Sequence, residues 1–335
     1  LFRLHSEHLM LASALVARSN IQWGLGHPGY AEYLLTEALD VSAKTGNYRT
    51  ASVALRQLGI FKYHQSDYSQ SEDLLKASLK ICRDHPGVGR ANLLRARLAH
   101  VRLLTIKQDW DASLGELRDL EAEIELDDVL SRVLWHEYLS ITLLGRGEYD
   151  KAIEAIHVAQ NFAIEAQIAS YVFAELLWQE AALHLELFSP VKALELVNKA
   201  IAITEQCGNY REYAQMLRVK ATALYLLARI DEAVPLFQEA VAELRRRNNQ
   251  YELALTLTRM AEALEKDPHA ASEAASEAVA IFTRIDLPRM VAEARHAYDV
   301  AQLRAQAVAR PPGDTRPPRK VGGVIAESGA MRALL

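Results

Sequence analysis

The sequence predicts an all-α protein built as an array of antiparallel helix pairs. Half of the 335 residues are apolar and only 15 are Gly and 10 are Pro, a composition typical of helical proteins. A motif of a small residue, an apolar residue four positions later and a second small residue three further on recurs at seven places, at intervals of 38 to 42 residues, with Leu120 in place of the second small residue in the third copy. A unit of this length cannot bury its apolar face alone, so it must stack on its neighbours.

The clearest copy of the motif is Ala152, Ile156 and Ala159, after a turn at Gly147. The i, i+4, i+7 spacing places the three residues on one helix face, where small residues allow close approach of a neighbouring helix. The first small positions are Ala31, Ser71, Ser113, Ala152, Ala193, Ala233 and Ala271. The middle positions are Leu35, Leu75, Leu117, Ile156, Val197, Phe237 and Ala275, and the last are Ala38, Ser78, Leu120, Ala159, Ala200, Ala240 and Ala278.

Each motif helix follows another apolar-periodic stretch, which predicts the first helix of each pair. These stretches are 1–19, 51–63, 91–107, 130–144, 171–187, 213–228 and 253–264. Turn and helix-stop residues separate the segments, for example Gly46-Asn47, Ser66-Asp67 and Gly208-Asn209. A last helix over 289–306 carries enough polar residues to close the stack as a cap.

The pattern resembles the tetratricopeptide repeat. The resemblance rests on Leu58-Gly59 and Tyr68 in the second repeat, and on Gly147, Tyr149, Ala152 and Ala159 in the fourth. It covers residues 1–305 and implies a right-handed superhelical solenoid whose concave groove binds a protein or peptide partner. The period of about 40 exceeds the usual 34 residues, which adds about one helical turn to each pair.

Bulk properties exclude several classes of function. A net charge of −5 excludes a generally basic nucleic-acid-binding surface. Cys82 and Cys207 are the only cysteines and fit neither a disulfide framework nor a zinc site, so we expect a reducing, cytoplasmic environment. No run approaches the roughly 18 apolar residues of a membrane span, and we expect no membrane partner.

We find no catalytic constellation and no metal site in the sequence. His136-Glu137 lacks the second His of a zinc-protease helix. Gly24-Leu25-Gly26, Gly145-Arg146-Gly147 and Gly322-Gly323 lack the full phosphate-loop pattern. We therefore expect this segment to be neither an enzyme nor a cofactor-binding protein.

The resemblance also implies which side chains face the groove. Projecting the groove positions of the repeat onto this chain gives Arg56, Ile60, Tyr63, Arg95, Arg102, Thr105, Glu137, Ile141, Glu175, Trp178, Ala182, Arg218, Thr222 and Tyr225. Because Arg and large aromatic residues are enriched at binding hot spots, the candidate partner-binding residues are Arg56, Tyr63, Arg102, Trp178, Arg218 and Tyr225. The alternative is that Trp178 and Tyr225 fill the core between helices, while the arginines coat a solvated face.

The chain changes character after the array. Residues 306–322 read as a Pro-rich, basic linker, and 323–335 as the beginning of a further domain. The latter segment resembles the start of the ATPase domain of sigma-54-dependent transcriptional activators, through Ile325, Glu327, Ser328, Ala330, Met331, Leu334 and Leu335. Ala326 and Gly329 depart from that pattern, which commonly has Gly and Pro there.

This second resemblance implies that the array is the sensory or protein-interaction region of a multidomain bacterial regulator. ATP and magnesium are then expected only in the domain beyond Leu335, and RNA polymerase sigma-54 and DNA would be contacted only through domains outside this segment. Two alternatives stay open. The chain could be a non-transcriptional scaffold, or the helical module of a kinase-linked or nucleotide-binding signalling protein.

Overall fold

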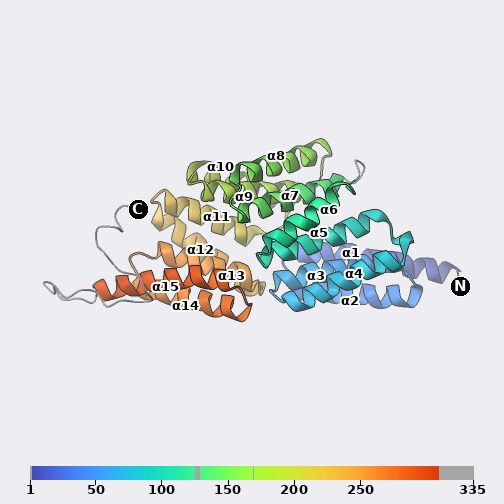
Figure 1. Ribbon diagram of the computed structural model, residues 1–335. Coiled ribbons are helices and arrows are strands. Elements are labelled where there is room, and N and C mark those ends of the chain that lie inside the picture. The colour runs from blue at the N-terminus through green and yellow to red at the C-terminus, as the bar shows by residue number, and fades with distance from the viewer. Residues whose placement is uncertain (1, 125–128, 169, 309–335) are drawn as a thin grey trace. The chain divides into compact units, whose positions relative to one another are not determined.

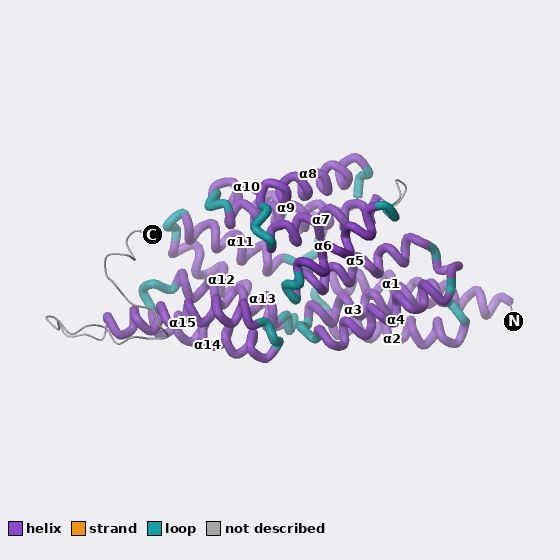
Figure 2. Tube along the Cα trace, viewed as in Figure 1, coloured by secondary structure: helices purple, strands orange, loops and turns teal. Residues whose placement is uncertain are grey.

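The computed structural model describes residues 2–124, 129–168 and 170–308. Within these ranges the chain forms fifteen α-helices and one short 3-10 helix, and no strand (Figures 1 and 2). The all-α prediction is confirmed. The segments predicted as a further domain (323–335) and as most of the linker lie outside the described residues.

The helices alternate along the chain as seven pairs and a final helix, as the repeat spacing predicts. The first helices of the pairs are α1 (Phe2–Gly24), α3 (Tyr48–His64), α5 (Arg90–Ile106), α7 (Val129–Gly145), α9 (Ser170–Glu186), α11 (Tyr213–Leu226) and α13 (Gln250–Ala263). The second helices are α2 (Pro28–Thr45), α4 (Tyr68–Asp84), α6 (Trp110–Glu121), α8 (Tyr149–Glu165), α10 (Pro190–Cys207), α12 (Ile230–Arg246) and α14 (Pro268–Arg284). The 3-10 helix η1 (Pro86–Val88) precedes α5, and α15 (Pro288–Val308) follows the last pair.

Two predicted boundaries were wrong. α1 continues to Gly24 rather than ending at Ser19, because Trp23 in its last turn stacks on Phe61 of α3 with ring centroids 3.8 Å apart. α15 continues to Val308, so residues 306–308 are helical and do not begin a linker. Ala305, Gln306 and Ala307 are good helix formers, and the first proline comes only at Pro311.

The chain divides into two compact units inside α11, between Ala223 and Leu224. Unit 1 contains α1 to α10 and most of α11, and unit 2 contains the end of α11 and α12 to α15. In unit 1 the first helices α1, α3, α5, α7 and α9 each pack on their own second helix, and α1 also packs on α3, α3 on α5 and α5 on α7. In unit 2, α15 packs on both α14 and α13, which is the position predicted for a capping helix.

The repeated motif forms the core of each unit. All 21 motif positions, from Ala31 to Ala278, are at most 1% exposed. Where the small residue is Ser, its hydroxyl bonds a polar group of the facing helix. Ser71 Oγ donates to the Gly59 carbonyl at 2.8 Å, and Ser78 Oγ donates to the Ser52 carbonyl at 2.8 Å. Small residues therefore set the close spacing between helices.

Gly59 explains the Leu-Gly pair of the second repeat. A β-carbon placed on Gly59 would lie 2.9 Å from Leu75 of α4. The absence of a side chain thus allows α3 and α4 to approach closely.

Turn residues end and begin the helices as expected. Gly46 and Gly208 adopt left-handed conformations with φ of 64° and 66° after α2 and α10. Asp67 Oδ1 accepts a hydrogen bond from Gln70 N at 3.0 Å, which caps α4, and Asp267 caps α14 in the same way. Of the helices in the described ranges, none combines the length and hydrophobicity needed to cross a membrane.

Unit 1 also contains a contact between its two ends. Tyr210 N, in the turn before α11, donates to the carbonyl of Gly24 at the end of α1 at 3.0 Å. Asn209 lies so close that a β-carbon on Gly24 would be 3.2 Å from its side chain. The end of α1 therefore contacts the turn that follows α10.

Candidate ligand-binding face

The first helices of unit 1 bring polar and aromatic side chains together in one electrostatically linked cluster, which we call the polar network. Its members are Arg56 and Tyr63 of α3, Arg95 and Arg102 of α5, Glu137 and Tyr138 of α7, Glu175, Trp178 and Gln179 of α9, and Arg211 and Glu212 just before α11. Four successive first helices and the turn before α11 thus contribute to one site.

The repeat register explains why these residues meet. Arg56, Glu137 and Trp178 each lie 22 residues before the second small residue of their repeat. Arg95 and Glu175 each lie 25 residues before it, one helical turn further toward the N-terminus. Because the small residues occupy equivalent places in the stack, residues at equal offsets from them lie on the same face.

Short hydrogen bonds connect neighbouring helices within the network. Gln179 Nε2 donates to Glu137 Oε1 at 2.7 Å, which joins α9 to α7. Trp178 Nε1 donates to Glu212 Oε2 at 2.7 Å. Arg211 Nη2 lies 2.5 Å from Glu175 Oε2 and 3.5 Å from Glu212 Oε1. Arg211 therefore contacts two carboxyl groups.

The two carboxyl groups on α7 and α9 are difficult to ionise. Burial raises the pKa of Glu137 to about 7, although Arg102 and the bond from Gln179 act in the opposite direction. Burial and the nearby charge of Glu212 raise the pKa of Glu175 well above its ordinary value, despite the contact with Arg211. Both carboxyl groups therefore hold a proton to a higher pH than an exposed glutamate does, and Glu137 titrates near neutral pH.

Burial also shifts the pKa values of the tyrosine and arginine side chains in the polar network. Burial raises the pKa of Tyr63 to about 12, against the effect of the Arg102 and Arg211 guanidinium groups. Burial lowers the pKa of Arg102, but Tyr63, Tyr138 and Glu137 together raise it above its ordinary value. Arg102 is therefore fully charged, and its guanidinium carbon lies 5.9 Å from the centre of the Tyr138 ring.

Three acceptor atoms on consecutive first helices are buried and have no hydrogen-bond partner among the described residues. They are Oε2 of Glu137, Oε1 of Gln179 and Oε1 of Gln215. The three residues are 0%, 6% and 4% exposed. An unpaired buried polar atom costs about 1–3 kcal/mol, so these atoms are expected to have a functional reason. They can accept N–H donors from a bound molecule.

The structure brings together four of the six residues predicted to bind a partner. Arg56, Tyr63 and Arg102 belong to the polar network, and Trp178 joins it through Glu212. Trp178 is also 6% exposed and packs in a core of α9, α10 and α11, so its indole serves the core as well. Arg218 is half-buried on α11 in unit 1.

Tyr225, near the end of α11, follows the division of the chain and belongs to unit 2. Its hydroxyl is 3.2 Å from Glu265 Oε1. Burial, followed by the Glu265 charge, raises the pKa of Tyr225 to about 12.

Sequence reasoning missed several members of the network. Tyr138 and Gln179 directly follow the projected positions Glu137 and Trp178. A projection that added the next residue to each groove position would have included them. Arg211 and Glu212 precede the start of α11 and lie outside the projected helix. Their position depends on the contact between the Asn209–Tyr210 turn and α1, for which the sequence has no local signal.

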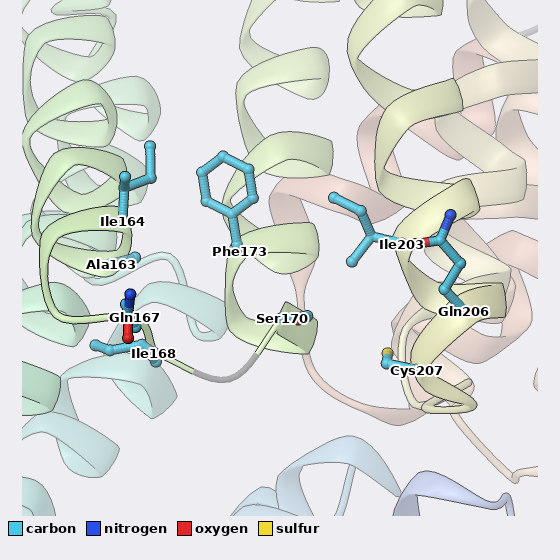
Figure 3. Close-up of a pocket in the computed structure, with 9 residues that line it drawn as sticks. All are labelled: Ala163, Ile164, Gln167, Ile168, Ser170, Phe173, Ile203, Gln206 and Cys207. Atoms are coloured by element: carbon cyan, nitrogen blue, oxygen red, sulfur yellow. The ribbon is translucent and has the colours of Figure 1, made fainter.

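Unit 1 also has an open cleft of about 340 Å³, where α8 ends, α9 begins and α10 ends. Figure 3 shows Phe173 of α9 between Ile164 of α8 and Ile203 of α10. None of the six predicted residues lines this cleft, and its lining residues carry no charge. Across the described ranges, no cluster of three His, Cys, Asp or Glu side chains is arranged to hold a metal ion.

Comparison with solved structures establishes the fold. The chain is similar to NprR in complex with its cognate peptide NprX, with 15% identity and a TM-score of 0.51, over 64% of this chain and 63% of NprR. It is also similar to a Rap protein complexed with Competence and Sporulation Factor, with 12% identity and a TM-score of 0.55, over 90% of this chain and 99% of that one.

A third similar structure is a signal transduction ATPase with numerous domains from Pyrococcus horikoshii, which carries a tetratricopeptide repeat sensor. It has 10% identity and a TM-score of 0.55, over 90% of this chain and 45% of that one. The present chain thus spans less than two thirds of both NprR and this ATPase. No protein-family profile and no curated protein matches the sequence. The chain has a tetratricopeptide-like helical repeat fold.

Proposed function

We propose that unit 1 is a peptide-binding sensor, and that the polar network on its first helices contacts the peptide. The unpaired buried acceptors of Glu137, Gln179 and Gln215 carry this proposal. An extended peptide offers a row of backbone N–H donors, and these three acceptors come from three consecutive helices. A purely structural core would favour apolar residues at such positions.

The comparisons support this proposal through the neighbours' own ligands. NprR was solved with its peptide NprX, and the Rap protein with Competence and Sporulation Factor. Rings and guanidinium groups such as Trp178, Tyr138 and Arg102 are the side chains that dominate binding energy at interfaces. On this proposal the segment acts by binding rather than by catalysis, in the cytoplasm.

A display selection of random octapeptides against the whole chain tests this function. We expect enrichment of peptides that bind with micromolar or tighter Kd, as measured by titration calorimetry. The proposal is contradicted if no peptide binds above background, or if the selected peptides bind a chain that lacks residues 1–223 equally well.

Replacement of one unpaired acceptor separates binding from folding. Gln215→Met keeps the size of the side chain and removes the unpaired amide oxygen, so we expect an unchanged or higher Tm and a peptide affinity lower by about tenfold. Gln70→Met on the exposed start of α4 is the matched control and should leave the affinity unchanged. Equal affinities of the two variants would exclude Gln215 from the site.

We further propose that this sensor belongs to a sigma-54-dependent transcriptional regulator. The resemblance of residues 323–335 to the start of the activator ATPase domain supports this assignment, although the segment lies outside the described residues. Peptide binding on unit 1 would then restrain or release the following ATPase through the residues after α15. A parent reading frame with a Gly-x-x-x-x-Gly-Lys loop within a few tens of residues after Leu335 is the expected result, and its absence would contradict the assignment.

One comparison favours a different kind of full-length protein for this segment. The Pyrococcus horikoshii ATPase carries its tetratricopeptide sensor in the same chain as a nucleotide-binding domain. A nucleotide-binding or kinase domain encoded before Leu1, with no phosphate loop after Leu335, would support this parent. Either kind of full-length protein would use the same peptide-binding face of unit 1.

A further inference from the structure

Arg56 of α3 is a half-buried cation that lacks a carboxylate neighbour. Among the described residues it has neither a hydrogen bond nor an ion pair, and the charged group close to it is the Arg95 guanidinium on the adjacent helix α5. Burial, followed by the charge of Arg95, lowers the pKa of Arg56 to about 10. A half-buried guanidinium group without a carboxylate neighbour is incompletely compensated, so a ligand with negative charge would pair with Arg56.

The side chains near Arg56 also carry hydrogen-bond donors. Tyr138 of α7 also acts on Arg56, and the Arg102 guanidinium carbon lies 5.9 Å from the Tyr138 ring centre. Burial and the charge of Glu137 raise the pKa of Tyr138 well above its ordinary value, so its hydroxyl stays protonated and can donate. Arg95 and Tyr138 thus both act on Arg56, and Arg102, which also interacts with Glu137, reaches the same tyrosine.

The overall charge of the network also favours an anion. In the described part of the chain, the polar network links four arginines (Arg56, Arg95, Arg102 and Arg211) to three carboxyl groups (Glu137, Glu175 and Glu212). The whole chain has a net charge of −5. The excess of arginines over carboxyl groups in the polar network is therefore opposite in sign to the charge of the chain.

We propose that Arg56, Arg95, Arg102 and the Tyr138 hydroxyl form an anion site for a carboxylate group of the peptide ligand. This inference rests on the proposed peptide-binding function and specifies the chemistry of the ligand. The carboxylate is either the peptide's C-terminus or an Asp or Glu side chain, since guanidinium groups bind both in the same geometry. The acceptors of Glu137, Gln179 and Gln215 would contact the N–H groups of the same peptide.

The test uses the tightest peptides from the display selection, each synthesised in three forms. One form is unmodified, one has an amidated C-terminus, and one has every Asp and Glu replaced by Asn and Gln. We expect one neutralised form to bind at least about tenfold more weakly than the unmodified form, and the form that fails identifies the source of the carboxylate. Equal binding of all three forms overturns the anion site but leaves the peptide-binding function intact, whereas failure to select any peptide removes both.

Substitution of Arg56 tests the location of the site. Arg56→Gln should weaken binding of the unmodified peptide about tenfold but change the affinity of the neutralised peptide less than twofold, because both changes remove the same interaction. Arg56→Lys should restore part of the affinity. Arg118→Gln, which makes the same charge change on the exposed face of α6, should have no effect.

The stability of the free chain distinguishes a ligand-binding arginine from a structural one. Removal of a half-buried cation without a carboxylate neighbour should leave the Tm of Arg56→Gln equal to or above that of the wild type. A lower Tm together with equal affinity losses for the unmodified and neutralised peptides would show that Arg56 supports the fold, and would overturn the proposal.

Discussion

Glu137 shows how the array gives unusual properties to single residues. Its side chain is fully buried on α7, one oxygen accepts from Gln179, and the other has no partner among the described residues. A carboxyl group in such a place favours its protonated form. The residue therefore links the ionisation of the network to the stability of the chain.

Stability should fall as the pH rises through the range in which Glu137 titrates. Burial raises the folded pKa from 4.5 to about 7, so the unfolded chain loses this proton at a lower pH than the folded chain does. The contribution of Glu137 is therefore most favourable below pH 4.5, and the free energy of unfolding decreases by up to about 3 kcal/mol between pH 4.5 and 7.

Urea denaturation at several pH values measures this effect. Glu137→Gln cannot titrate, so its free energy of unfolding should decrease less over the same range. Glu154→Gln, on the exposed face of α8, is the control and should follow the wild type. A Glu137→Gln profile parallel to that of the wild type would show that this carboxyl group ionises normally.

At the scale of the elements, small residues determine how closely the helices pack. Gly59 has no room for a β-carbon beside Leu75, whereas a β-carbon on Gly115 of α6 would have no neighbour within 4 Å. Both glycines lie inside helices, where alanine is intrinsically preferred by about 1 kcal/mol. The two sites thus differ in packing alone.

Gly59→Ala should destabilise the chain by about 1–3 kcal/mol, because α3 and α4 must separate to accept the methyl group. Gly115→Ala should stabilise it by about 0.5–1 kcal/mol. Thermal unfolding followed by circular dichroism measures both. Equal changes at the two sites would contradict the close approach of α3 and α4.

At the scale of the whole molecule, the helix pairs and their order could be predicted from the sequence, but the division into units could not. The motif from Ala31 to Ala278 predicts every second helix, since its spacing reports directly on one buried face. The division falls inside α11, within the sixth repeat, where the spacing of the motif does not change, so the periodicity gives no sign of it. The network was partly predictable, because Arg56, Arg102 and Trp178 follow from the repeat register. Arg211 and Glu212 do not, because they depend on a contact between distant turns.

α15 should be needed for the stability of unit 2. Its buried residues, which include Met290, Ala294 and Leu303, cover apolar side chains of α13 and α14. Removal of residues 288–335 should lower the Tm and increase binding of the dye ANS, because this apolar surface becomes exposed. Removal of 309–335 alone is the control and should change neither. Equal behaviour of the two truncations would show that α15 is not a cap.

Hydrogen–deuterium exchange with and without a selected octapeptide tests the central claim most directly, since it locates the bound peptide on the chain. The account predicts that the peptide slows exchange in α3, α5, α7, α9 and the start of α11, where the polar network lies. Protection confined to the second helices, or to the cleft where α8 and α10 end, would contradict it.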